Sequence, residues 1–195
     1  MGGVASTSGL SSGISYCQKC PSIRSGDLIK RQAHTQEQHA IENANKALSY
    51  ARDHGWLTIL VKVGFESNYH AQPKESPIFG KANEFKALEL DSFGTEFHQD
   101  LDVQPTDFII EKPRVSPFYG TPLEPVLRAN KVDELIVCGV STAWAIQAVT
   151  RDAHDRDYKV TIIEDACAAT DQKEHTTSIE MLSRIANIVK ADDLA

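Results

Sequence analysis

Cysteine and long apolar runs are both scarce in this chain, and each scarcity excludes a class of protein. Four cysteines among 195 residues are too few for a disulfide framework, so we expect reduced thiols. No apolar run approaches the roughly 20 residues that a membrane span requires, and the first residues lack the apolar centre of a secretory signal. We therefore expect a cytoplasmic protein with no membrane partner.

Positive charge is also in short supply, with 20 basic against 27 acidic side chains and a net charge of −7. A protein that binds phosphate backbones needs a basic surface, so this balance argues against a nucleic-acid partner. The segment "CQKC", from Cys17 to Cys20, lacks the second CxxC or histidine pair of a zinc site, and no GxGxxG occurs. We expect neither a metal nor another cofactor.

The chain has the length and apolar content of one domain, because 41% of its 195 residues are hydrophobic and no composition shift marks a second domain. Residues 1–26 are rich in glycine and serine and carry almost no periodic apolar pattern. We expect them to form a flexible or divergent arm, with the domain itself spanning residues 27–195.

Helical patterns alternate with short apolar runs along that domain. The helical pattern from Thr35 to Gly55 places Ile41, Ala44 and Leu48 on one face and starts with a capping box at Thr35. Strand-like runs follow at residues 57–63, 107–112, 134–140 and 159–165, with helical stretches at 122–130, 142–155 and 174–187. This order predicts an α/β fold, a three-layer α/β/α, Rossmann-like arrangement with a parallel sheet covered on both faces.

In such a sheet the ligand site lies beyond the carboxyl ends of the strands. The candidate segments are therefore residues 64–69, 112–119, 140–145 and 165–169. Four aromatic side chains in or beside them either line a pocket for a small molecule or cover the rim of the sheet: Phe65, Tyr69, Phe118 and Tyr119. Trp144 either fills the core or stacks on a planar ligand.

Four linked motifs give the chain a resemblance to a known family. They are "GTEFHQDL", "IIEKPRVSPFYGTPLEPVLR", "LIVCGVST" and "AVTRDAHDRDYKVTIIEDACAA", in the order that the family expects. From about Ala33 to Leu194 the chain resembles the isochorismatase-like, or cysteine hydrolase, superfamily. The resemblance implies a hydrolase of a small-molecule substrate and a homo-oligomer.

The resemblance also implies a triad of Asp, Lys and Cys, of which this chain keeps one member. Lys112 in "IEKPRVSPF" matches the family lysine. The nucleophile normally lies six residues after the glycine of "CGV", and counting from Gly139 reaches Ala145, which carries only a methyl group. At the acid position, alignment of Gln18 with the family glutamine places Tyr16, whose pKa near 10 makes it a poor proton donor.

Two interpretations follow from these replacements. Isochorismatases in this family also lack the cysteine and cleave a vinyl ether by protonation, so the first is a hydrolase of a small amide or vinyl-ether metabolite without a cysteine nucleophile. Its candidate acids are Glu66, Glu111 and Asp165, of which Asp165 is typical of a structural residue. The alternative is a catalytically inactive relative, a pseudoenzyme or small-molecule binder that keeps the fold without the triad.

Two further features are implied by the resemblance. The turn made by Val140, Ser141 and Thr142 matches the place where the family has a non-proline cis peptide that turns backbone N–H groups toward an oxyanion. The family's first strand, which lies in the middle of the sheet, is degenerate or missing here. Either residues 13–17 fill its place poorly, or the amino-terminal segment is unrelated to the natural start of the fold.

Overall fold

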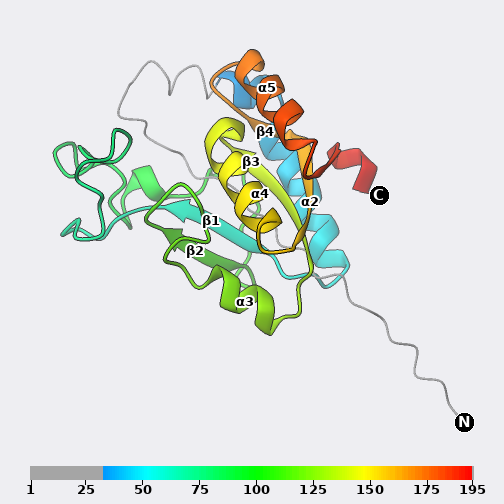
Figure 1. Cartoon of the computed structure of the whole chain (residues 1–195), viewed down its shortest axis with the longest axis horizontal. Coiled ribbons are helices and arrows are strands. Elements are labelled where there is room, and N and C mark those ends of the chain that lie inside the picture. Colours follow the sequence, from blue (N-terminus) through cyan, green and yellow to red (C-terminus); the bar gives the residue numbers. More distant parts are fainter. Residues whose placement is uncertain (1–32, 195) are drawn as a thin grey trace, which may run out of the picture.

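Parallel strands form the centre of the molecule in the computed structural model, which describes residues 33–194 (Figure 1). The regular elements in chain order are α2 (Ala40–Asp53), β1 (Ile59–Val63), η1 (Phe93–Thr95), β2 (Phe108–Lys112), α3 (Leu123–Ala129), β3 (Glu134–Val140), η2 (Thr142–Ile146), α4 (Gln147–His154), β4 (Lys159–Ala168), α5 (Gln172–Leu182), β5 (Asn187–Val189) and η3 (Ala191–Leu194). The alternation expected from the sequence is therefore confirmed.

The strands pair in two separate ladders. β1 runs parallel to β2, with Ile59 opposite Phe108, and the second ladder has the order β3-β4-β5, again parallel throughout. Within residues 33–194 no strand joins these ladders, as expected of this fold when its first strand is not among them. Residues 1–26, Tyr16 and the proposed first strand at 13–17 lie outside the described residues, so the expectations about them stay predictions.

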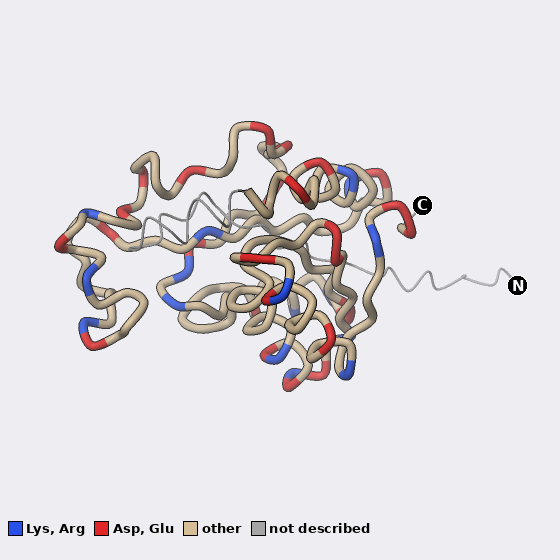
Figure 2. Tube along the Cα trace, turned by 90° about the horizontal axis from the view of Figure 1, so that it is seen from above, with Lys and Arg blue, Asp and Glu red and all other residues tan. Residues whose placement is uncertain are grey.

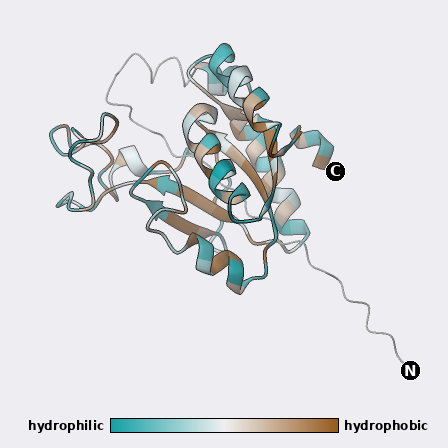
Figure 3. Ribbon diagram, viewed as in Figure 1, coloured by the Kyte–Doolittle hydropathy of each residue, from teal (hydrophilic) through white to brown (hydrophobic). Residues whose placement is uncertain are grey.

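One hydrophobic core joins the two ladders. It takes side chains from both sheets and from the covering helices, and its fully enclosed members include Leu48, Leu60, Leu127, Ile162 and Leu182. Burial of each such side chain stabilises the fold by about 1.5–3 kcal/mol. Figure 1 shows α4 in front of the strands and α2 behind them, and Figure 3 shows the strands as the most hydrophobic elements. The layers are those predicted.

The helix ends differ from the sequence expectations. Residues 33–37 are already helical, so Thr35 lies inside a helix and is not a cap. α2 begins after His39, which has the left-handed φ of 51° and makes no side-chain cap hydrogen bond. α5 ends at Leu182, five residues before the predicted end, because the chain turns there to add β5 to the sheet.

A long connection between β1 and β2 forms a small lobe that projects from the sheet (Figure 1). The lobe has its own apolar cluster, which includes Phe65, Tyr69, Phe79 and Leu88. Gly80 is required in it, because a Cβ atom there would lie 2.5 Å from the Lys74 carbonyl oxygen.

Charge is mixed along the described trace. Figure 2 shows basic and acidic residues interspersed on the elements of the fold. No helix among residues 33–194 combines the length and the apolar character needed to cross a bilayer.

Candidate functional site

The turn after β3 has the backbone that the resemblance implies. The peptide bond between Val140 and Ser141 is cis, which confirms that prediction. The register of β3 on β4 shifts between Val137 and Gly139, and Gly139 has a φ of 134° that side chains disfavour. A glycine just before the turn is therefore a local requirement of this geometry.

The turn leads into η2, a single wide helical turn that carries the predicted nucleophile position. The N–H groups of Trp144 and Ile146 both donate to the Ser141 carbonyl oxygen, at 3.2 Å each. Ala145 is partly exposed, and Trp144 is 52% exposed. Trp144 therefore does not fill the core, and its side chain is half exposed at the surface.

Ser141 has a buried hydroxyl group. The residue is only 4% exposed, and its Oγ has no hydrogen-bond partner among the residues that the structure describes. A buried hydroxyl without a partner costs about 1–3 kcal/mol. A polar group of a ligand bound at the turn would remove that cost.

Two histidines behind the turn were not found from the sequence. Thr142 Oγ1 lies 2.9 Å from Nδ1 of His175, which is 5% exposed and belongs to α5. His34 lies beside it, with ring centroids 5.5 Å apart, and its Nδ1 accepts from the Ala169 N–H. Burial, followed by the neighbouring His34, lowers the pKa of His175. No local pattern signals this pair, because its members come from opposite ends of the domain.

Lys112 closes β2 at the end of the strand where the sequence placed it. The residue is 8% exposed, and its Nζ donates to the Val115 carbonyl oxygen at 2.6 Å. The ammonium group is therefore held by the turn that follows its own strand.

The four aromatic candidates do not gather in one place. Phe65 and Tyr69 belong to the cluster of the lobe, where the Tyr69 hydroxyl donates to the Ala87 carbonyl. Phe118 is buried in the main core, whereas Tyr119 is 59% exposed with the Arg114 guanidinium 5.3 Å from its ring. Within this set, only Tyr119 presents its ring to solvent as Trp144 does.

The three candidate acids have other surroundings or partners. Glu66 is exposed, Glu111 forms an ion pair with Lys62 at 3.0 Å, and the Asp165 carboxylate accepts from the Ala191 N–H at 2.9 Å. The predicted structural role of Asp165 is therefore confirmed. Among residues 33–194, no group of three or more His, Cys, Asp or Glu side chains is arranged to hold a metal ion.

The thiols of the strands are enclosed. Cys138 and Cys167 are fully buried on β3 and β4. Burial raises the pKa of the Cys138 thiol well above its usual value and that of Cys167 to about 12. Because the thiolate is the nucleophilic form, neither residue replaces the missing nucleophile.

Comparison with known proteins agrees with this architecture. The Isochorismatase domain family matches residues 26–193. The isochorismatase family protein YecD of Escherichia coli O157:H7 is 28% identical over 162 residues, which cover 83% of this chain and 84% of that protein. The ureidoacrylate amidohydrolase RutB of Acinetobacter baylyi is 32% identical over 65% of this chain, but the match spans only 57% of that protein.

Solved structures share the fold. The isochorismatase family protein of Desulfovibrio vulgaris superposes with a TM-score of 0.77 at 20% identity, covering 94% of this chain and 96% of the other. Because the family match spans nearly the whole described domain, the chain belongs to the isochorismatase family.

Proposed function

We propose that this protein is a hydrolase of a small amide or vinyl-ether metabolite and that it works without a cysteine nucleophile. The observation that carries the proposal is the Ser141 hydroxyl, buried on the cis turn and without a partner among residues 33–194. This hydroxyl lies on the turn that leads into η2, the element that carries Ala145, and it has a hydrogen to donate to a substrate oxygen. The amidohydrolase name of the RutB relative supports an amide as one of the two substrate classes.

Each residue has a role in this scheme. Lys112 orients the substrate and stabilises negative charge, while the Ser141 hydroxyl and the Ala145 N–H donate hydrogen bonds to the developing oxyanion. Because Ala145 has no nucleophilic atom, water adds directly to an amide carbonyl, and the tetrahedral intermediate then expels the amine after an acid has protonated its nitrogen. For a vinyl ether, an acid first protonates the double bond and water adds to the resulting cation. The hemiketal formed then loses a proton and separates into a carbonyl product and an alcohol.

The identity of the acid is the open part of the scheme. Glu66 is exposed, and Glu111 and Asp165 are held by other partners, as described above. Among residues 1–32 the sequence contains a single carboxylate, Asp27, which makes Asp27→Asn the first substitution to test.

A panel of substrates tests the proposal. Purified protein is incubated with isochorismate, ureidoacrylate, nicotinamide and N-carbamoyl amino acids, and products are followed by mass spectrometry. The expected result is turnover of at least one substrate, unchanged after the native protein is treated with iodoacetamide. Turnover that disappears on alkylation would contradict a mechanism free of cysteine.

The alternative function is a binding protein that has lost catalysis, and the methyl group of Ala145 is the observation that favours it. Ala145→Cys separates the two. A gain of amidase activity in this variant means that the remaining geometry is competent for the cysteine route. No turnover by either the wild type or the variant, with ligand binding retained in calorimetry, favours the binder.

A further inference from the structure

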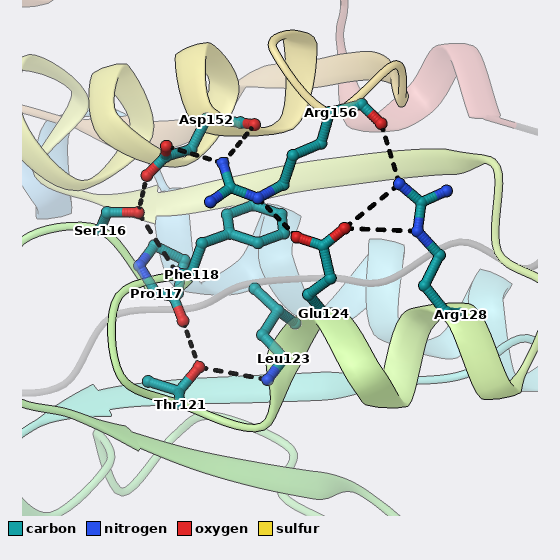
Figure 4. Close-up of polar contacts among 9 residues, drawn as sticks. All are labelled: Ser116, Pro117, Phe118, Thr121, Leu123, Glu124, Arg128, Asp152 and Arg156. Carbon is teal, nitrogen blue, oxygen red and sulfur yellow. Dashed lines mark hydrogen bonds and ion pairs between the residues drawn. The ribbon is translucent and has the colours of Figure 1, made fainter.

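A polar cluster formed by α3, by α4 with the turn that follows it, and by the turn after β2 is not used by the scheme above. Figure 4 shows its members pointing toward one another from these three segments. Arg156 lies at its centre and donates to Glu124 on α3 at 2.5 Å and to the Asp152 carboxylate at 2.8 Å. The second carboxylate oxygen of Asp152 accepts from the Ser116 hydroxyl. We call these four residues the Arg156 clamp.

The clamp fixes Arg156 in a definite geometry. One guanidinium nitrogen also donates to the Asp152 carbonyl oxygen at 2.9 Å, and the planar group lies 4.6 Å from the centre of the Phe118 ring. The Arg156 side chain is 32% exposed. An isolated ion pair at this exposure contributes little, but a forked guanidinium with two carboxylates and an aromatic face forms a network that is geometrically specific.

Ser116 is the point where the clamp touches the turn after β2. Its Oγ also accepts the Phe118 N–H at 3.2 Å, so one hydroxyl holds both the turn backbone and the α4 carboxylate. One residue earlier in the same turn, the Val115 carbonyl accepts from Lys112 Nζ at 2.6 Å. Asp152 on α4 is therefore connected to Lys112 through the Ser116 side chain and the peptide unit between Val115 and Ser116.

The clamp also spans the two ladders of the sheet. β2 belongs to the ladder β1-β2, whereas α4 is continuous with η2, which follows β3 of the other ladder. Lys112 is the last residue of β2 in one ladder, and Ala145 lies on η2, which follows β3 of the other ladder. The contact between Ser116 and Asp152 joins the segments that follow Lys112 and Ala145.

We propose that the Arg156 clamp is a positioning device that sets Lys112 relative to the turn at Ser141. It holds the turn after β2 against α4, and that turn presents the Val115 carbonyl to Lys112 Nζ. Arg156, Asp152 and Ser116 act through Lys112 and do not touch substrate. The effect on turnover rests on the proposed function, whereas the effect on Lys112 itself does not.

Ser116→Ala is the mildest variant, because it cuts the contact with Asp152 and leaves the pairs of Arg156 intact. Arg156→Gln removes the centre of the clamp, and Arg156→Lys keeps the charge but not the fork. Arg151→Gln is the matched control, because Arg151 is exposed on α4, near Arg156 in the chain, and its side chain donates only to Gln147 among the hydrogen bonds of the described residues.

The measurement is the acetylation rate of Lys112 in the folded protein under a pulse of acetic anhydride, read by peptide mass spectrometry. The acetylation rate of exposed Lys173 corrects for differences in reagent concentration. The rate at Lys62, which pairs with Glu111 outside the clamp, shows whether a variant loosens the whole structure. We expect Lys112 to react about tenfold faster in Ser116→Ala and Arg156→Gln, the scale of one lost hydrogen bond to a charged group. The Lys112 acetylation rate in Arg156→Lys should lie between the rates in these variants and in the wild type. The rate in Arg151→Gln should equal that of the wild type.

The outcomes separate this inference from the proposed function. Unchanged Lys112 labelling in both clamp variants, or an equal rise at Lys62, would overturn the positioning role. With an active substrate, Ser116→Ala should lower kcat/KM about tenfold while Arg151→Gln leaves it unchanged. If labelling rises as expected but the wild type turns over no substrate, the clamp stands and the hydrolase proposal fails.

Discussion

At the scale of single residues, the proposed chemistry depends on the methyl group of Ala145 and the ammonium group of Lys112. Ala145 stands at the nucleophile position on η2, and Lys112 ends β2 in a buried setting. Both were predicted from the sequence, because a motif with fixed spacing carries each of them. The contact of His175 with Thr142 was not predicted, because it depends on α5 packing on the turn.

The depressed pKa of His175 makes stability depend on pH. In the unfolded chain this histidine has the usual pKa near 6.5, so as pH falls the unfolded state takes up the proton first. The contribution of neutral His175 to the free energy of unfolding is therefore fully present above pH 6.5. It is lost as pH falls toward the lower pKa of the folded state. The slope for one proton cannot exceed about 1.4 kcal/mol per pH unit.

Urea unfolding between pH 5 and pH 7.5 measures this dependence. We expect His175→Gln to have a shallower pH slope than the wild type, and His154→Gln, which changes an exposed histidine, to keep the wild-type slope. Equal slopes in wild type and His175→Gln would mean that His175 is not the titrating group.

The two enclosed thiols give a second test at this scale. Because burial raises the pKa values of Cys138 and Cys167, we expect neither to be alkylated by iodoacetamide at pH 8 in the native protein. Both should react fully in urea, as peptide mass spectrometry will show. Native alkylation of Cys138 at the rate of a free thiol would refute its enclosure and reopen the question of a cysteine nucleophile.

At the scale of elements, the sequence predicts strands better than helix ends. The four apolar runs coincide with β1 to β4 within a few residues, because a largely buried parallel strand needs a nearly continuous apolar run. β2 keeps such a run although Ile109 is 46% exposed. The start of α2 was wrong because His39 takes a left-handed conformation, which interrupts the helical pattern between residues 37 and 40. β5 was missed because "NIV" is too short to be distinguished from a helix end.

Gly139 tests the geometry at the end of β3. Its φ of 134° lies outside the left-handed region that other residues sometimes occupy, whereas Gly55 at the end of α2 has a φ of 66° with no atom within 4 Å of an added Cβ. We expect Gly55→Ala to lower the free energy of unfolding by about 1 kcal/mol and Gly139→Ala by about 1–3 kcal/mol. Urea denaturation gives both values, and equal losses would contradict a special backbone at Gly139.

At the scale of the whole molecule, the described chain is two parallel ladders held by one core. Ile110 from one ladder and Val137 from the other belong to the same buried cluster, so the halves fold as one domain. The sequence predicted this layered arrangement and the family, and the structure and the family match confirm both. It predicted neither the Arg156 clamp nor the histidine pair, since both depend on contacts between elements that are distant in the chain. The homo-oligomer stays a prediction.

The most direct test of the account is kcat/KM for the best substrate of the panel, compared between the wild type and Lys112→Met, which keeps most of the apolar stem and removes the ammonium group. If Lys112 stabilises charge in the transition state, the variant should lose at least about 100-fold in kcat/KM while it unfolds at a similar urea concentration. Equal values in the two proteins, or no turnover by a folded wild type, would contradict a lysine-centred hydrolase.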